Sequence, residues 1–148
     1  MRKRTESLRL IPALHRATHG VGLYLQALRL GVSQGEAHVL AQLVAEGPST
    51  ISALHAAFAH RRSTLTSILD RLVASGLVQR EVDAADRRSF LVSLTPRGAA
   101  LARKVYAALA SLEAKAGKKV RPSDLAGFAV VVEALQEAAR RAGQGEKS

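Results

Sequence analysis

The chain has 148 residues, which suffices for one domain with a proper hydrophobic core and is too short for two independent enzymatic domains. Apolar residues make up 47% of it and aromatic residues only 3%, so the core must consist of aliphatic side chains, which favours packed helices. The net charge of +10 suggests a polyanionic partner, and the absence of cysteine excludes disulfides, thiolate metal sites and thiol-based redox sensing.

The N-terminal segment MRKRTESLRL is basic, but the apolar run of a secretory signal does not follow it. No stretch approaches the roughly 18 apolar residues of a membrane span, so we expect a soluble, cytoplasmic protein without a membrane partner. From Leu8 to Leu28 apolar residues recur at helical spacing, interrupted by Pro12 and by a pair of glycines. This pattern predicts a long first helix.

A capping box marks the start of the second predicted helix. Ser33 and Glu36 have the S-x-x-E spacing in which the hydroxyl and the carboxylate each accept a hydrogen bond from an otherwise unpaired amide. The helix is predicted from about Gln34 to Glu46, and Gly47-Pro48 ends it.

Two short helices are predicted next. The first begins near Thr50 or Ser52, and the second runs from about Arg62 to Ala74, with Gly76 as the left-handed residue after it. Two short helices joined by a tight turn form a helix-turn-helix.

A charged hairpin and two long helices complete the predicted order. Residues 77–82 and 90–94 alternate as strands do, and the polar segment 83–89 joins them. Thr95-Pro96 opens a helix that runs to the region of Gly117, and Pro122 opens the last one. The predicted fold is therefore mainly α with a small β-hairpin, an α+β class.

Residues 60–98, HRRSTLTSILDRLVASGLVQREVDAADRRSFLVSLTPRG, resemble the MarR (multiple antibiotic resistance regulator) family of winged helix-turn-helix transcription regulators. The pattern D-x-R-x-x-x-[LV]-x-L-T is present as Asp86, Arg88, Val92, Leu94 and Thr95. The order of elements resembles the family over essentially the whole chain. The resemblance implies one domain over 1–148, with a winged helix-turn-helix over 33–95 and helical dimerisation regions over 1–30 and 96–148.

A recognition helix needs short polar and basic side chains in its first turns, where they meet base edges and where the helix dipole favours phosphate. The candidates are Arg61, Arg62, Ser63, Thr64, Thr66 and Ser67. The usual cap position falls on Arg61, and Ser63 is the alternative cap. Arg71 lies further along and would reach a flanking phosphate, unless Asp70 or a wing carboxylate holds it in a salt bridge.

Arg87 and Arg88 lie at the predicted hairpin tip. The resemblance implies that one of them enters the minor groove, where narrow A·T-rich sequence attracts arginine, and that Asp86 orients it. The alternative is that both are solvated loop charges. Residues 58–95 hold six arginines and four acidic residues, so most of the net charge lies outside this region and a DNA contact here depends on where the arginines are placed.

The first and the last two helices carry apolar stripes, and a single winged domain reads too few base pairs for useful specificity. We therefore expect a two-fold homodimer on a pseudo-palindromic operator. The resemblance implies that the terminal helices of two copies interleave; the alternative is an intramolecular core. The residues concerned are Leu8, Ile11, Leu14, Leu125, Phe128, Val132 and Leu135.

Three histidines are candidates for an effector pocket. His15 and His19 share a helical face, and His38 falls midway along the second predicted helix. MarR-type proteins commonly bind effectors between the first helix, the second helix and the helix after the wing, so a small anionic or phenolic molecule is the expected ligand. The alternative is that the histidines are interface or solvated residues. Two histidines without a third ligand do not make a metal site, so we expect no metal and no cofactor.

The sequence carries no P-loop, G-x-S-x-G, H-E-x-x-H or paired carboxylates typical of an active site, so we do not expect an enzyme. The expected function is that of a ligand-responsive DNA-binding regulator, and the resemblance favours repression over activation. The alternative is an architectural, nucleoid-type DNA-binding protein without an effector.

Overall fold

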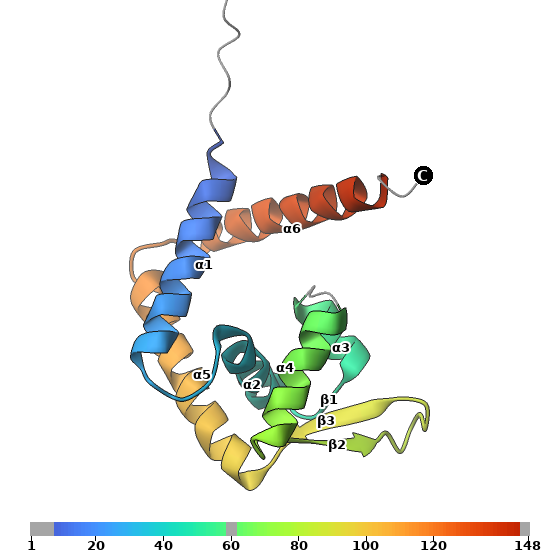
Figure 1. The fold of residues 1–148 in the computed structure, drawn as a ribbon. Helices are drawn as coiled ribbons and strands as arrows, with labels where there is room; N and C mark the ends of the chain where they lie inside the picture. The colour runs from blue at the N-terminus through green and yellow to red at the C-terminus, as the bar shows by residue number, and fades with distance from the viewer. Residues whose placement is uncertain (1–7, 59–61, 146–148) are drawn as a thin grey trace, which may run out of the picture. The chain divides into compact units, whose positions relative to one another are not determined.

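A computed structural model describes residues 8–58 and 62–145, with side chains as far as residue 143. The elements follow the predicted order, with one additional short strand (Figure 1). The fold is mainly helical with a small antiparallel sheet, as the sequence predicts. The helices are α1 (Leu10–Ala27), α2 (Gln34–Glu46), α3 (Ile51–Phe58), α4 (Arg62–Ala74), α5 (Pro96–Gly117) and α6 (Pro122–Gly145), and the strands are β1 (Ser49–Thr50), β2 (Val78–Val82) and β3 (Phe90–Leu94).

Side-chain caps set the starts of the helices around the sheet. At α2, Glu36 N–H donates to Ser33 Oγ over 3.3 Å and Ser33 N–H donates to Glu36 Oε2 over 2.8 Å, which confirms the predicted capping box. At α5, Gly98 N–H donates to Thr95 Oγ1 over 2.9 Å. After α4, Gly76 has a φ of +68°, the left-handed conformation expected of it.

The sheet has the strand order β1-β3-β2, and both pairings are antiparallel. The predicted hairpin is confirmed, with Val78 opposite Leu94 and Val82 opposite Phe90. Strand β1 was not predicted. It consists of two residues, too few to show an alternating pattern. It forms because the chain between α2 and α3 pairs with the edge of β3 that β2 does not occupy.

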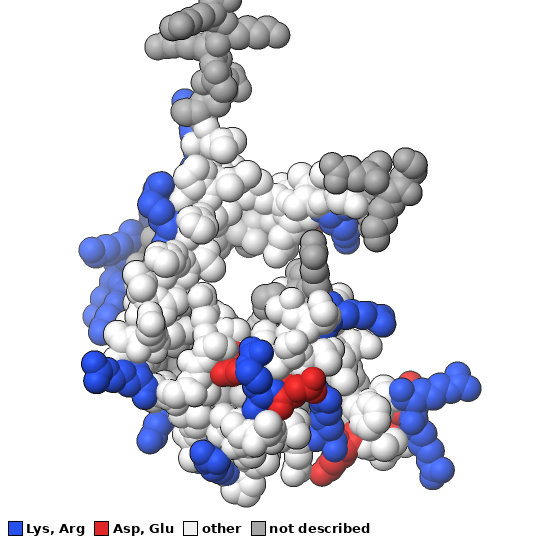
Figure 2. All heavy atoms as spheres, viewed as in Figure 1, with Lys and Arg blue, Asp and Glu red and all other residues white. Residues whose placement is uncertain are grey.

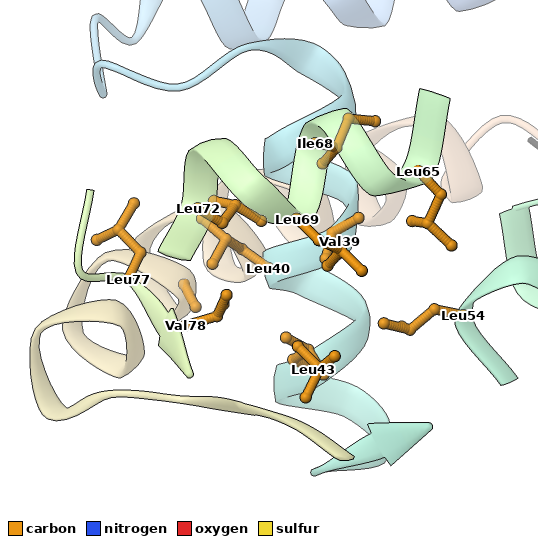
Figure 3. Close-up of a cluster of buried hydrophobic side chains, with 12 residues drawn as sticks. Val39, Leu40, Leu43, Leu54, Leu65, Ile68, Leu69, Leu72, Leu77 and Val78 are labelled. Carbon is orange, nitrogen blue, oxygen red and sulfur yellow. The ribbon is translucent and has the colours of Figure 1, made fainter. Parts of the chain in front are cut away.

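The hydrophobic core joins α2, α3 and α4 to the sheet (Figure 3). Leu40 from α2, Leu54 from α3, Leu69 from α4 and Val92 from β3 are each 1% exposed or less. The predicted buried side of the fourth helix is confirmed, because its leucine and isoleucine side chains all point into this cluster. The core therefore fixes α4 by one face and leaves the opposite face outward.

The start of α5 approaches the chain between α4 and β2 very closely. Thr95 N–H donates to the Leu77 carbonyl oxygen over 3.1 Å, and the Thr95 hydroxyl donates to the Gly76 carbonyl oxygen over 2.7 Å. Gly98 lies buried against the same Leu77 carbonyl, and a Cβ on this glycine would collide with the carbonyl oxygen. A residue without a side chain is therefore required at this position.

The chain divides into two compact units, Met1–Ala108 and Leu109–Ser148, with the boundary inside α5. In the first unit α1 lies against the first part of α5, where the Tyr24 hydroxyl donates to the Ala108 carbonyl oxygen over 3.3 Å. The second unit contains the rest of α5 and α6. No helix in the described part of the chain is both long and apolar enough to cross a membrane.

Candidate nucleic-acid interface

The first turns of α4 present a polar outer face. All of the predicted side chains that the structure describes here are exposed, while Leu65, Ile68 and Leu69 between them are buried. The exposed residues are Arg62, Ser63, Thr64, Thr66 and Ser67. Arg61, the remaining candidate, lies outside the described residues. The alternative cap, Ser63, is wrong as a cap, because it lies inside α4, which begins at Arg62.

A recess of about 330 Å³ separates α3 from α4. Ile51, Ser52 and His55 line it from α3, and Arg62 and Thr66 are among the α4 residues that line it. Two predicted DNA-binding residues thus share a concave, mostly polar surface with α3.

An ordered turn holds the tip of the β2–β3 hairpin. Asp83 N–H donates to the Ser89 carbonyl oxygen over 3.0 Å, and Asp83 Oδ1 accepts from Ala85 N–H over 2.9 Å. Asp86 Oδ1 accepts from the backbone N–H of Arg88 over 3.0 Å. Asp86 thus contacts the main chain of Arg88, and no ion pair between their side chains occurs in the described residues.

Arg87 and Arg88 are exposed at this turn, and Figure 2 shows basic side chains extending from the end of the β2–β3 hairpin. They are the basic residues of the tip segment 83–89, and both side chains are exposed. The hairpin therefore carries two arginines on a short, hydrogen-bonded loop, which is the arrangement that a minor-groove contact requires.

Arg71 pairs with a residue that the sequence did not suggest. Its Nε lies 2.7 Å from Glu36 Oε1 on α2, so the alternative partners, Asp70 and a wing carboxylate, do not hold it in this structure. Asp70 pairs instead with Arg80 on β2, over 2.8 Å. Consecutive residues of a helix point about 100° apart, so Asp70 and Arg71 reach different elements.

Glu36 is the buried charged residue among those described. Burial by itself would raise the pKa of this carboxyl, but hydrogen bonds from the Ser33 backbone and from Arg71, together with the arginine charge, hold the pKa below its ordinary value. The carboxylate is therefore ionised at neutral pH. The S-x-x-E spacing revealed its capping role, whereas nothing in the sequence indicated its second partner.

The histidine candidates separate in the structure. His15 and His19 are exposed on α1 with stacked rings, 6.4 Å between centroids. His19 also lines a recess of about 370 Å³ between α1 and the start of α2, together with Gly22, Gln26 and Gln34 among others. His38 is half-buried in the middle of α2 and is not part of that lining. The lining comes from α1 and residues 32–34, without the expected contribution from α5.

The side chains of the predicted dimerisation residues differ in how exposed they are in the single chain. Leu8 and Ile11 on the N-terminal side, and Leu125 and Phe128 on α6, are exposed apolar side chains. The remaining three are half-buried: Leu14, Val132 and Leu135.

Comparison with known proteins identifies related sequences and structures. Residues 30–89 match the model of the MarR family. The HTH-type transcriptional regulator PetP of Rhodobacter capsulatus is 30% identical over 92 residues, which cover 62% of this chain and 55% of PetP, so the chain spans about half the length of that relative.

Two solved structures share the fold. A mutant MarR from E. coli complexed with operator DNA is 25% identical, with a TM-score of 0.67 over 86% of this chain and 91% of that one. The MepR–DNA complex of S. aureus has a TM-score of 0.73 at 16% identity, covering 90% of this chain and 99% of that one.

Proposed function

We propose that this chain, whose residues 30–89 match the MarR family model, is a member of that family and a sequence-specific transcription regulator that binds double-stranded DNA, a ligand-responsive repressor acting in the cytoplasm. The observation that carries the proposal is the pair Arg87 and Arg88 on an ordered wing tip, in the same unit as the exposed polar turns of α4. In this proposal α4 enters the major groove and the wing contacts the adjacent minor groove. Both of the solved structures named above are DNA complexes, which supports the same partner.

Selection of duplexes from a random pool, followed by mobility-shift titration, tests this function. We expect a large ratio of specific to non-specific affinity and a steep salt dependence, with a slope of about −0.9 in log K against log salt for each phosphate neutralised. A dimer that contacts about six phosphates would lose roughly a thousandfold in affinity between about 50 and 200 mM salt. An architectural protein would show little preference over random competitor, and a flat salt response would contradict DNA as the partner.

We also propose that the protein is a homodimer, formed through the predicted dimerisation residues named above, which on α6 lie on one face of the helix with Leu125 and Phe128. Leu125 and Phe128 are 57% and 55% exposed in the single chain, which is costly for side chains on the same face of a helix. We expect Leu125→Glu to weaken dimerisation at least about tenfold, because a charge would have to be buried in the interface. Sedimentation velocity over a concentration series measures this.

Val130→Glu provides the control for this substitution. Val130 is 66% exposed and lies on the opposite side of α6 from Leu125, so the same change there should leave the dimer intact. A wild-type protein that sediments as a folded monomer would contradict the proposal.

A third proposal concerns the effector, a small anionic or phenolic molecule in the recess beside His19. Such a ligand must bind the DNA-incompetent conformation more tightly than the competent one, or it would shift nothing. We expect salicylate-like aromatic acids to release the wild-type protein from DNA, and His19→Ala to remove the response. His15→Ala is the matched variant, since His15 does not line the recess and should retain most of the response. Equal responses in all three proteins would mean that His15 and His19 do not bind the effector and are interface or solvated residues.

A further inference from the structure

Two consecutive residues of α4, Asp70 and Arg71, form ion pairs with other elements, and the carboxylates of the two pairs differ in how far they are buried. Arg71 reaches Glu36 on α2, where the carboxylate side chain is 12% exposed. Asp70 reaches Arg80 on β2, and the Asp70 side chain is 58% exposed. An exposed ion pair contributes little to stability, whereas a buried carboxylate that loses its partners leaves an uncompensated charge in the interior, which is costly. The Glu36 pair is therefore the one that constrains α4.

Glu36 is itself fixed at the start of α2. Its Oε2 accepts from Ser33 N–H over 2.8 Å, so both carboxylate oxygens are occupied, one by the cap and one by Arg71. The neighbouring Gly35 packs against Ile68 of α4, so closely that a Cβ there would lie 2.9 Å from the Ile68 Cδ1 atom. Arg71 is thus tied to a carboxylate that the backbone of α2 and the packing of α4 hold in place.

Arg71 stays 56% exposed despite this pair. A guanidinium is rigid and planar, so fixing its Nε also fixes the direction of its two Nη groups. Within the described residues these Nη groups have no partner. The Arg71 side chain is therefore held by a buried carboxylate at its Nε and exposes its remaining N–H donors. It does so on α4, the helix whose first turns are proposed to contact the bases.

We propose that Glu36 is a positioning residue of the DNA interface, which holds Arg71 by its Nε so that the Nη groups meet a phosphate flanking the site read by α4. The inference rests on the proposed DNA-binding function. In this proposal Arg71 forms the salt bridge with Glu36 and contacts the phosphate at the same time, because the salt bridge uses Nε and leaves the Nη groups for the phosphate. The ionised state of Glu36 at neutral pH supports this, because a neutral carboxyl would hold the arginine weakly.

The test measures affinity and salt slope for a duplex that the wild-type protein has selected from a random pool. Arg71→Ala should weaken binding roughly tenfold for each protomer, as expected for a hydrogen bond to a charged group, and reduce the salt slope by about 0.9 per protomer, or about 1.8 for the proposed dimer, since each copy loses one phosphate contact. Glu36→Gln should lose several-fold in affinity with a similar decrease in slope, although it removes no positive charge. The double variant should bind no more weakly than Arg71→Ala alone, because both changes remove the same contact.

Two further variants separate positioning from stability. Ser33→Ala removes the hydroxyl that caps α2 but keeps the backbone N–H and the Arg71 pair, so it should lower the melting temperature and leave affinity and slope unchanged. Arg71→Lys keeps the charge, but a single ammonium cannot hold Glu36 by one group and a phosphate by another, so binding should still weaken.

Additive losses in the double variant would overturn the inference, and so would an unchanged salt slope in Glu36→Gln or an equal loss of affinity in Ser33→Ala. In each of these cases the wild-type protein still binds DNA and the proposed function stands. Failure of the wild-type protein to select or bind any duplex would overturn the proposed function and the inference with it.

Discussion

Replacing Gly98 with alanine is expected to lower the free energy of unfolding by about 3 kcal/mol or more, the largest effect of a glycine-to-alanine change among the glycines whose surroundings the structure describes. The added Cβ would collide with the Leu77 carbonyl oxygen, a backbone atom that also accepts from Thr95 N–H. Neither α5 nor the start of β2 can move aside without breaking that hydrogen bond. Urea denaturation followed by circular dichroism measures the loss.

Gly20→Ala is the matched control. Gly20 lies inside α1 with open space where its Cβ would be, so alanine there should stabilise the protein by about 0.5–1 kcal/mol through its higher helix propensity. If Gly98→Ala proved as harmless as Gly20→Ala, the close approach of α5 to Leu77 would be wrong.

The largest effect on DNA binding is expected at the wing. Arg88→Ala, and to a lesser degree Arg87→Ala, should weaken operator binding by roughly five- to a hundredfold, the range of a good groove contact, without changing the helical circular dichroism or the dimer mass. The tip makes no contribution to the hydrophobic core, so folding should be unaffected. The effect should be greater at Arg88, because Asp86 holds its backbone N–H.

Arg103→Ala tests whether position or total charge matters. Arg103 is exposed on α5, outside the reading face, so its loss changes the net charge by the same amount as the loss of Arg88. We expect a much smaller decrease in affinity for Arg103→Ala. Equal losses would mean that the overall positive charge drives binding, and unchanged affinity in both wing variants would remove the wing from the interface.

Elements whose ends are determined locally could be predicted from the sequence. The bounds of α2 follow from the capping box and from the glycine and proline after Glu46, and the buried face of α4 follows from its helical periodicity. In both, the residues that decide the structure lie within a few positions of one another. The polar face of α4 and the arginine-tipped hairpin follow for the same reason.

Contacts between distant segments could not be predicted. Glu36 and Arg71 are 35 positions apart, and only the packing of α2 against α4 brings them together. Strand β1 likewise depends on a partner some 40 residues later in the chain, at Leu91 and Val92. At the wing, the sequence predicts that Asp86 orients an arginine, whereas the structure shows its carboxylate accepting from the Arg88 main chain, a contact that depends on the turn geometry.

The strand order β1-β3-β2 leaves β2 at the edge of the sheet, with no further strand beside it in the described chain. Such an edge exposes a row of backbone donors and acceptors to which a second molecule could add a strand, which is a common route to aggregation. Three of the exposed side chains of β2 are polar or charged, Gln79, Arg80 and Glu81, and a strand entering from solution would have to desolvate these groups. Arg80, whose ion pair with Asp70 attaches the hairpin to α4, thereby also helps to protect the protein from edge-to-edge association.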